Sequence, residues 1–470
     1  FTGIGIEITV ENGQVTVVTP IEDTPAYRAG LQSGDVILTI NGQPTQELSL
    51  QDVVSRIRGP KGTEVELGIL HSTSKSPKTI RVKREAIPLV SVKSKPLEDG
   101  YYWIRLTRFS GRTDEDLRDA LKKATRECAK TGGLKGIVLD LRNNPGGLLD
   151  QAVSVSDMFL SKGTIVSIQG RGPVPERIYE AKDQAGDIDV PVVVIINAGS
   201  ASASEIVAGA LRDQKRALII GERSFGKGLV QTTRPMPYNG MIKITTSKYY
   251  IPSGRSIQAI DYSHRNAAGR AERIPDSLTT AYTTAAGRIV RDGGGITPDV
   301  KVELEQIPNI VYYLVNDMYI FRYATRFAQQ HDTIAPIEAF VIDDEIYNDF
   351  KAYVQSQNFP SARRSQKVLD ELRKWTEFEG YLTDITPEID SLSKKLSHNL
   401  DHDFANFRDE IAEQLAFEIV KRYYYQKGEI CESLKDDPIV TRAEEILLEP
   451  EQYRAILQPG KASDKKEKKS

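Results

Sequence analysis

The chain has 470 residues, a length typical of about three domains, and its 39% hydrophobic and 27% charged residues are typical of globular proteins. Its 62 Lys and Arg against 65 Asp and Glu give a net charge of −3, which argues against nucleic acid as a main partner. Two cysteines exclude a disulfide scaffold and a four-thiolate zinc site. The apolar run Val192–Ile196 is far shorter than the roughly 20 residues of a membrane span.

Changes of pattern along the chain predict a multi-domain α/β protein with four segments. Residues 1–88 have the strand-like runs and turn signals of a β-rich domain, and residues 89–304 alternate strand and helix patterns. Residues 305–460 are predicted to be helical, and the charged tail, 461–470, is predicted to be disordered. Because the chain begins at Phe1 without an apolar signal region, we expect any export signal to lie outside it.

The first segment begins with two glycines at alternate positions, Gly3 and Gly5. Glycines in this arrangement let consecutive backbone N–H groups turn toward one point and bind a terminal carboxylate. The strand that follows offers an edge to an extended peptide, and a helix over Leu50–Ile57 would form the other wall of a groove. The other expected elements are strands at Ile4–Val10, Val15–Val18, Val36–Ile40 and Val65–Leu70 and a short helix at Pro25–Ala29.

Five motifs in order make this segment resemble a PDZ domain. They are Phe1-Thr2-Gly3-Ile4-Gly5-Ile6, Thr24-Pro25-Ala26, Ala29-Gly30-Leu31, Gly34-Asp35-Val36-Ile37 and Ile40-Asn41-Gly42. The resemblance implies that Gly3, Ile4, Gly5 and Ile6 bind the C-terminal end of a peptide. A lone Gly-x-Gly would favour an ordinary turn instead, but the ordered set favours the PDZ interpretation.

The second segment is predicted to build a mostly parallel sheet covered by helices, because strands and helices alternate. The hairpin signal Asn239-Gly240 lies at the centre of Val230–Tyr250. The expected strands are Tyr102–Leu106, Gly136–Leu141, Val190–Ile196 and Ala217–Ile220, and the expected helices are Asp114–Ala129, Leu149–Leu160 and Ser202–Asp213.

A serine-rich turn follows the buried strand that ends at Ile196. A helix begins directly after this turn, so a serine there lies near the positive end of the helix, where developing negative charge is stabilised. The residue pattern alone does not choose among Ser200, Ser202 and Ser204.

A nucleophilic serine needs a base, and no histidine occurs between residues 72 and 263. Lysine is the remaining strong candidate if its amine is neutral. Lowering the pKa of an amine from about 10.4 to near 7 takes roughly 4 kcal/mol, which burial can supply. Lys227 suits this role because it stands between glycines in an otherwise uncharged segment.

These residues belong to a longer recognisable pattern. Ser202 is the middle serine of the motif Ser-Ala-Ser-Ala-Ser-Glu, and Lys227 is the lysine of the motif Phe-Gly-Lys-Gly. Lys227 follows Ser202 by 25 residues, and Gln231 follows Lys227 by four. The accompanying motifs are Asp140–Gly147, Lys248–Gln258 and Gly293–Val300. Over residues 1 to about 300 the chain resembles the carboxyl-terminal processing peptidases, or tail-specific proteases, which use a Ser-Lys dyad on a core similar to crotonase and the Clp protease subunit.

The resemblance implies a role for each matching residue. Ser202 would be the nucleophile, Lys227 the general base and Gln231 the residue that orients the lysine. The backbone N–H groups of Gly146 and Ala203 would form the oxyanion hole. The resemblance implies no metal or organic cofactor, protein or peptide substrates with free apolar C-termini, and a periplasmic or otherwise exported location; it also admits a homo-oligomer.

The chain departs from the family pattern at several points. Pro145 precedes the two glycines and leaves the oxyanion donor open between Gly146 and Gly147, and Asp261–Ile289 is an insertion. Asp213 matches an acidic position of the family, and the sequence favours neither a structural nor a functional role for it. In the helical region, Phe404, Phe407, Ile411, Leu415, Ile419 and Tyr423 predict one apolar stripe on a long helix.

Some features of the sequence also fit functions other than that of a peptidase. A non-catalytic peptide-binding scaffold on the same fold is the main alternative, and an acyl-transfer or hydratase-type enzyme is a weaker one. Gly221–Lys227 matches a phosphate-binding loop only up to its last position, where Gly228 replaces the required Ser or Thr. For His398 and His402, a solvated polar helix face is favoured over a metal site.

Overall fold

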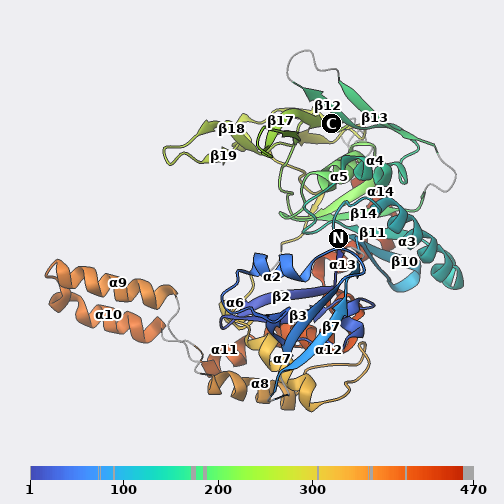
Figure 1. Cartoon of the computed structure of the whole chain (residues 1–470). Helices are drawn as coiled ribbons and strands as arrows, with labels where there is room; N and C mark the ends of the chain where they lie inside the picture. The colour runs from blue at the N-terminus through green and yellow to red at the C-terminus, as the bar shows by residue number, and fades with distance from the viewer. Residues whose placement is uncertain are drawn as a thin grey trace. The chain divides into compact units, whose positions relative to one another are not determined.

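The structure, a computed structural model, describes residues 2–71, 74, 76–87, 90–170, 176–183, 188–303, 306–357, 359, 364–396 and 400–458. The chain forms two compact units, each assembled from two separate stretches of sequence (Figure 1). The first unit combines residues 1–88 with 305–435, and the second combines residues 89–304 with 436–470. The helical stretch expected over 305–460 therefore contributes to both units. The tail predicted to be disordered, 461–470, lies outside the described residues.

The β-rich part of the first unit is a five-stranded antiparallel path in the order β2-β3-β4-β6-β7, with the short β5 beside β4. Apolar residues at alternate positions face the helix α2, and Val53 and Ile57 of α2 pack into the same core. All six predicted elements are confirmed, while β7 is not predicted from the pattern. The elements are β1 (Thr2–Gly3), β2 (Ile6–Glu11), β3 (Gln14–Pro20), α1 (Pro25–Arg28), β4 (Val36–Ile40), β5 (Gln43–Pro44), α2 (Leu50–Ile57), β6 (Glu64–Leu70), β7 (Lys78–Lys83) and β8 (Glu85–Ala86).

The helical part of the first unit has its own apolar core, in which α7 and α12 pack along each other. The expectation of one long helix over the apolar stripe is wrong at its start. Phe407, with φ −117° and ψ 35°, separates Phe404 on α11 from the rest on α12, and both helices contribute apolar residues to the same core. The helices are α6 (Asn309–Asn316), α7 (Tyr319–Gln330), α8 (Asp344–Ser356), α9 (Arg364–Phe378), α10 (Leu382–Leu396), α11 (Leu400–Asn406) and α12 (Arg408–Leu434).

The two parts of the first unit contact each other closely. Gly34 has φ +87°, and a Cβ built on it would lie 2.5 Å from Thr325 Cγ2, so this approach requires glycine. Arg322 Nε lies 3.5 Å from Glu11 Oε1 in the same region. Helix α7 therefore packs directly against the β-rich part.

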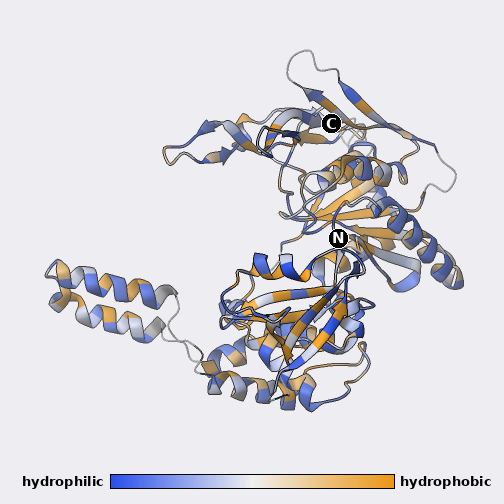
Figure 2. Ribbon diagram, viewed as in Figure 1, coloured by the Kyte–Doolittle hydropathy of each residue, from blue (hydrophilic) through white to orange (hydrophobic). Residues whose placement is uncertain are grey.

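The second unit is built on a six-stranded sheet in the order β22-β15-β14-β11-β10-β9. Its strands are parallel except β9, and every residue of β11, β14 and β15 is buried. Figure 2 colours the central strands of this unit mostly as hydrophobic. Strands buried on both faces read as continuous apolar runs, which is how the sequence presents them. The strands are β9 (Val92–Pro96), β10 (Tyr101–Leu106), β11 (Gly136–Asp140), β14 (Val192–Ile196), β15 (Ala217–Gly221) and β22 (Val300–Lys301).

Helices from distant parts of the chain cover this sheet. Helices α3 (Thr113–Cys128), α4 (Leu149–Asp157) and α5 (Ala203–Asp213) confirm the three predicted helices and share one core with the strands. Helices α13 (Pro438–Leu448) and α14 (Pro450–Leu457) return from the end of the chain and pack against β11, β14 and β15. The sheet is thus completed by residues more than 200 positions away from its central strands.

A second sheet with the order β13-β12-β17-β16 contains the predicted hairpin, whose arms β16 and β17 pair antiparallel. Part of the insertion forms two further hairpins, β18 with β19 and β20 with β21. No helix within the described ranges is long and apolar enough to cross a membrane. The strands are β12 (Lys162–Gly170), β13 (Arg177–Lys182), β16 (Leu229–Pro235), β17 (Met241–Tyr250), β18 (Ile260–Arg265), β19 (Ala271–Arg273), β20 (Ala281–Thr283) and β21 (Ile289–Arg291).

The attachment of α14 to the sheet predicts a stability effect for Tyr453→Phe. The buried Tyr453 hydroxyl accepts from Val192 N at 3.2 Å and donates to Val192 O at 3.1 Å. Removing it leaves buried backbone groups without this partner, so we expect a loss of about 1–3 kcal/mol in the free energy of unfolding, measured by urea denaturation. The matched change Tyr238→Phe, at a fully exposed tyrosine, should leave the stability unchanged. Equal stabilities of the two variants would contradict the anchoring role.

Candidate active site

The loops that follow β11 and β14 meet at the carboxyl ends of these neighbouring parallel strands. Ser200 Oγ donates to Leu141 O at 2.8 Å, and Ala201 N donates to Asn144 O at 3.0 Å. Asn143 N also donates to the Asn197 side chain at 2.9 Å. Adjacent parallel strands end at the same edge of a sheet, which is a common position for binding and catalytic sites.

The three candidate serines differ in their availability. Ser200 and Ser204 are fully buried, and their hydroxyls donate to the backbone carbonyls of Leu141 and Asn144, at 2.8 and 2.9 Å. Ser202 is partly exposed. The two neighbouring hydroxyls therefore hold the turn together, whereas Ser202 alone of the three reaches solvent.

The backbone at Ser202 is strained. Its φ of 57° and ψ of −113° lie outside the regions that residues with a side chain normally occupy, and α5 begins directly after it. A serine on a sharp strand-to-helix turn presents its hydroxyl at the top of a sheet, next to the positive end of the helix dipole.

A single buried carboxylate, that of Glu205, joins this turn to the loop that carries Lys227. Its Oε2 accepts from Ser202 N and from Lys227 N, each at 2.8 Å. Its Oε1 accepts from Gly226 N at 2.7 Å and from Ser224 Oγ at 2.5 Å. Glu205 is therefore bound by four donors from two segments about 20 residues apart.

The environment of Glu205 affects its protonation in two opposite directions. Complete burial raises the pKa of the carboxyl above its usual value, while the hydrogen bonds from Ser224 and from the backbone N–H groups oppose this rise. The sequence did contain a signal for this residue, because Glu205 is the only charged residue between Asp189 and Arg212. The motif Ser-Ala-Ser-Ala-Ser-Glu includes Glu205 but does not by itself assign it a role.

Tyr249 on β17 is a second residue that motif reading did not assign. Its buried hydroxyl lies 3.3 Å from Ser202 O and also contacts Lys227 O, so its single proton is shared between two acceptors. Burial raises the pKa of Tyr249, and the nearby charge of Glu205 raises it further, which keeps the hydroxyl protonated.

The side chains of Lys227 and Gln231 are exposed in this structure, Gln231 on strand β16. The uncharged, glycine-flanked segment predicts surroundings that bury Lys227, and this prediction is wrong for the structure described here, in which the side chain is exposed. Within the described residues, no hydrogen bond joins the Lys227 ammonium to Ser202 Oγ. Gln231 and the neighbouring Lys248 line a cavity of about 660 Å³ that also includes Ser256 and Gln258.

The expected oxyanion donors lie around the same turn. A Cβ on Gly146, which has φ +93°, would lie 2.8 Å from Ala203 N and 2.7 Å from Ala201 O, so the close approach of the two loops requires glycine. The Gly146 N–H donates to Asn144 Oδ1 at 2.9 Å. Ala203 is the first residue of α5, where a helix leaves its N–H groups without intrahelical acceptors.

Asp213, at the other end of α5, has structural partners. It is 1% exposed, pairs with Arg255 at 3.0 Å and accepts from Ser253 N at 3.1 Å. It therefore ties α5 to the loop after β17. Of the two histidines considered for a metal, His398 lies outside the described residues.

The predicted peptide-binding residues line a groove in the first unit. A cavity of about 440 Å³ is bordered by Gly3–Ile8 on one side and by Leu50, Val54 and Ile57 of α2 on the other. Strand β2 is the edge strand of its sheet. The groove thus combines an unpaired strand edge with an apolar helix face.

Family models match three parts of the chain. The model of peptidase family S41 matches residues 100–263, a PDZ domain model matches residues 16–70, and the C-terminal helical domain of a probable PDZ-protease matches residues 310–447. These matches confirm the predicted combination of a PDZ domain, an α/β peptidase core and a helical region. The last match also places the helical region, which sequence analysis left without a family.

Curated relatives and solved structures carry related names. The chain is 48% identical over 262 residues to a carboxy-terminal-processing protease of Bartonella bacilliformis, covering 55% of this chain and 59% of the relative. It is 40% identical over 260 residues to a probable CtpA-like serine protease of Staphylococcus aureus, covering 55% and 50%. The chain thus spans between half and three fifths of the length of these relatives.

Among solved structures, a photosystem II D1 C-terminal processing protease is 31% identical, with a TM-score of 0.35, covering 65% of this chain and 74% of that one. The PDZ domain of a carboxy-terminal protease from Vibrio cholerae, solved in complex with a peptide, is 26% identical with a TM-score of 0.18. That match covers 19% of this chain and 97% of the Vibrio chain.

The bonds of Glu205 predict that Glu205→Gln loosens both loops. The amide keeps the shape but replaces one acceptor with a donor, so at least one backbone N–H loses its partner. We expect a loss of about 1.5–3 kcal/mol in the free energy of unfolding and faster hydrogen exchange at the amides of Gly226 and Lys227. The control Glu222→Gln, in the same loop, should change neither. Unchanged exchange in Glu205→Gln would show that the carboxylate does not hold the loop.

Proposed function

We propose that this chain is a carboxyl-terminal processing protease of peptidase family S41. In this proposal it is an endopeptidase that captures the C-terminal tail of a protein and hydrolyses peptide bonds with a Ser-Lys dyad. The observation that carries the proposal is the strained, partly exposed Ser202 at the start of α5, connected to the Lys227 loop through Glu205.

Ser202 is the nucleophile in this proposal. The hydroxyls of Ser200 and Ser204 donate hydrogen bonds to backbone carbonyls, which leaves Ser202 as the one of the three serines that can face a substrate. These bonds support Ser202 as the nucleophile. Neutral Lys227 takes the proton of the Ser202 hydroxyl as Oγ attacks the carbonyl carbon of the scissile bond. The C–N bond then breaks and the leaving amine receives that proton. Water hydrolyses the resulting acyl ester by the reverse proton path.

In this proposal, Lys227 becomes an effective general base when a substrate is bound. Lys227 is exposed in the substrate-free chain, and a peptide laid over it would exclude water and favour the neutral amine. The nearby Gln231 is proposed to orient the lysine as a positioning residue. Ala203 N and the amide of Gly146 are proposed as the oxyanion donors, and the Gly146 amide must exchange its bond to Asn144 for the substrate oxygen.

Tail recognition is assigned to the groove between β2 and α2. The N–H groups around Gly3, Ile4, Gly5 and Ile6 are proposed to bind the terminal carboxylate, and the tail adds to the free edge of β2. The apolar side chains of α2 favour an apolar last residue. This assignment makes proteins with free apolar C-termini the substrate class.

The exposure of Lys227 also supports one alternative, a peptide-binding scaffold without catalysis, because among the described residues no hydrogen bond brings the Lys227 side chain to Ser202 Oγ. A peptidase and a scaffold differ in whether the wild-type chain cleaves an unfolded protein with an apolar C-terminus.

The proposal also includes a periplasmic or otherwise exported location, which fractionation of cells that express the full-length protein tests. It further includes a homo-oligomer, which light scattering of the purified chain tests.

The dyad predicts that Ser202→Ala and Lys227→Ala each lower kcat/KM by at least about 10³-fold, because the nucleophile or its base is removed. The measurement is cleavage of an unfolded protein with an apolar C-terminus. Lys243→Ala, at an exposed lysine of β17, is the control and should retain wild-type activity. Full activity in either dyad variant would refute the assignment, and an inactive wild type would favour the scaffold.

The groove predicts that Leu50→Gln weakens binding of a peptide with a free apolar C-terminus by about tenfold, since it removes apolar surface from the groove wall. Amidation of the peptide terminus should weaken binding to a similar extent because the charge is lost. Fluorescence anisotropy with a labelled peptide measures both. The control Val10→Gln changes an exposed residue that does not line the groove. Equal affinities for the free and amidated peptides would contradict carboxylate capture.

A further inference from the structure

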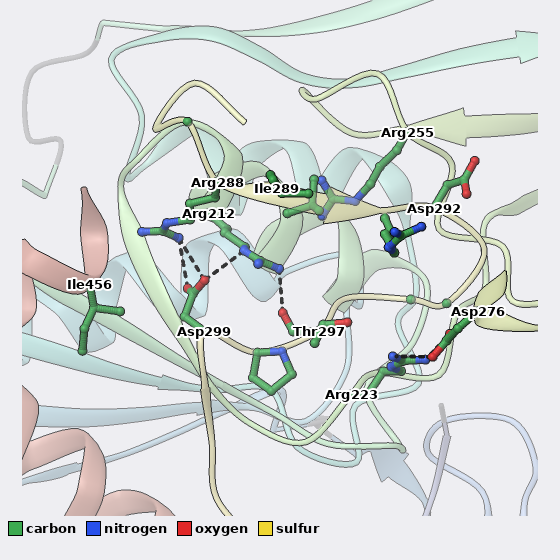
Figure 3. A pocket seen from close by; sticks show the side chains of 16 residues that line it. Arg212, Arg223, Arg255, Asp276, Arg288, Ile289, Asp292, Thr297, Asp299 and Ile456 are labelled. Atoms are coloured by element: carbon green, nitrogen blue, oxygen red, sulfur yellow. Dashed lines mark hydrogen bonds and ion pairs between the residues drawn. The ribbon is translucent and has the colours of Figure 1, made fainter. Parts of the chain in front are cut away.

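The second unit contains a cavity of about 800 Å³ that the proposed catalytic residues do not line. Figure 3 shows its charged side chains. They come from α5, from the loop after β15, from the loop after β17 and from the segment before β22. Its charged residues are Arg212, Arg223, Arg255, Arg288, Arg291, Asp276, Asp292 and Asp299.

Three of the arginines are almost completely buried. Arg255 is 1% exposed, Arg212 6% and Arg288 7%. An arginine in this position is normally matched by a carboxylate, because a buried charge without a partner is costly. The number of available carboxylates therefore decides whether the site is neutral.

Among the described residues, two buried carboxylates serve the three buried guanidinium groups. Asp213 pairs with Arg255 at 3.0 Å. Asp299 is shared, with Oδ1 3.1 Å from Arg212 Nε and Oδ2 3.0 Å from Arg288 Nη1, and Figure 3 shows both arginines converging on it. The buried part of the site thus carries one positive charge in excess.

The charges nearer the opening do not remove this excess. Arg223 pairs with Asp276 at 3.0 Å, and both side chains are substantially exposed. Arg291 and Asp292 add one charge of each sign, and Asp292 accepts from Thr280 N. The whole site, with Asp213 included, therefore keeps a net charge of +1.

Some hydrogen-bonding capacity of the buried arginines is also unused. The Nε atoms of Arg255 and Arg288 are buried and have no hydrogen-bond partner within the described part of the chain. Arg212 Nε has only its ion-pair contact with Asp299. Native proteins rarely leave such donors unmatched, so these atoms indicate a missing acceptor.

The electrostatic surroundings of the buried arginines agree with this geometry. Burial lowers the pKa of Arg255 and of Arg288, the paired aspartates raise it, and the charge of Arg212 lowers it again in both cases. The guanidinium groups therefore repel one another, and an anion between them would relieve the repulsion.

We propose that this cavity is a binding site for a small, multiply charged oxyanion, of the kind that a phosphate or a polycarboxylate presents. The planar fork of arginine matches the oxygen pairs of both groups, and several forks in one pocket favour a ligand with more than one negative charge. The cavity has the volume of an ordinary small-molecule site. Its walls also include the apolar side chains of Ile289, Val290 and Ile456, of which Val290 is buried.

The wall of this cavity is connected to the candidate active site. The cavity is lined by Gly294 and Gly295, and the next residue, Ile296, donates its N–H to Ser224 Oγ at 2.7 Å. Ser224 in turn donates to Glu205 at 2.5 Å. Occupancy of the cavity is therefore expected to slow hydrogen exchange in the Lys227 loop as well as at the cavity itself.

Isothermal titration of the full chain with inorganic phosphate and, separately, with citrate tests the proposal without reference to peptidase activity. We expect one site per chain for at least one of the two anions, measured against sodium chloride at matched ionic strength. The anion that binds identifies the source of the oxyanion. Absence of binding by both at millimolar concentration would overturn the proposal.

Variants establish where the anion binds. Arg288→Gln should weaken binding at least about tenfold, because a charge-assisted pair of hydrogen bonds is lost. If this buried change prevents folding, the double variant Arg223→Gln/Arg291→Gln removes two exposed charges from the mouth and should still weaken binding severalfold. Arg112→Gln, at an exposed arginine elsewhere in the unit, is the control. Wild-type affinity in the arginine variants would place the anion elsewhere and overturn the proposal.

Discussion

The carboxylate of Glu205 is the interaction on which the geometry of the candidate site depends. It holds Ser202 N, Gly226 N and Lys227 N as well as the Ser224 hydroxyl. A carboxylate in water would exchange these donors freely, but a fully buried one must keep them, because each lost hydrogen bond leaves a charge in a low-dielectric interior. The turn before α5 and the loop after β15 are therefore held as one assembly, although they come from different βα units.

The sheet beneath this assembly gives it a fixed base. Its central strands are buried on both faces, and the second face depends on helices from the end of the chain. Arg142 connects the sheet to these helices. It forms ion pairs with Asp140 of β11 and with Asp437 at the start of α13, each at 2.6 Å. Burial lowers the pKa of Arg142, but the hydrogen bonds and charges of Asp140 and Asp437 raise it by more, so the pKa lies above its usual value.

The buried charged residues of the second unit have two different roles. Around Asp213 and Arg255 it ties α5 to the loop after β17, which a packed apolar contact could not do with the same directional precision. Around Arg212 and Arg288 it leaves a positive excess and unmatched donors. A buried arginine with its own carboxylate partner, such as Arg255 with Asp213, indicates a structural role. Buried arginines that outnumber their carboxylates, such as Arg212 and Arg288 on Asp299, indicate a bound anion.

The sequence by itself determined the local elements and the composition of the motifs. Strand β14 and helix α5 follow from an apolar run, a small-residue turn and a helical spacing, which are properties of neighbouring residues. The same holds for the β2–α2 module and for the hairpin around Asn239. The spacing of Ser202, Lys227 and Gln231 matched a known family pattern, but nothing local distinguished Ser202 from Ser200 and Ser204.

Only the tertiary structure decided which groups meet. It committed Ser200 and Ser204 to the loop after β11, brought Glu205 to the Lys227 loop, and returned α13 and α14 to the sheet. It also exposed Lys227, which its sequence neighbours had suggested would be buried. Hydrophobic spacing reports the environment of a residue along one element, whereas burial, hydrogen-bond partners and charge balance depend on elements that are distant in sequence and become neighbours only in the folded chain.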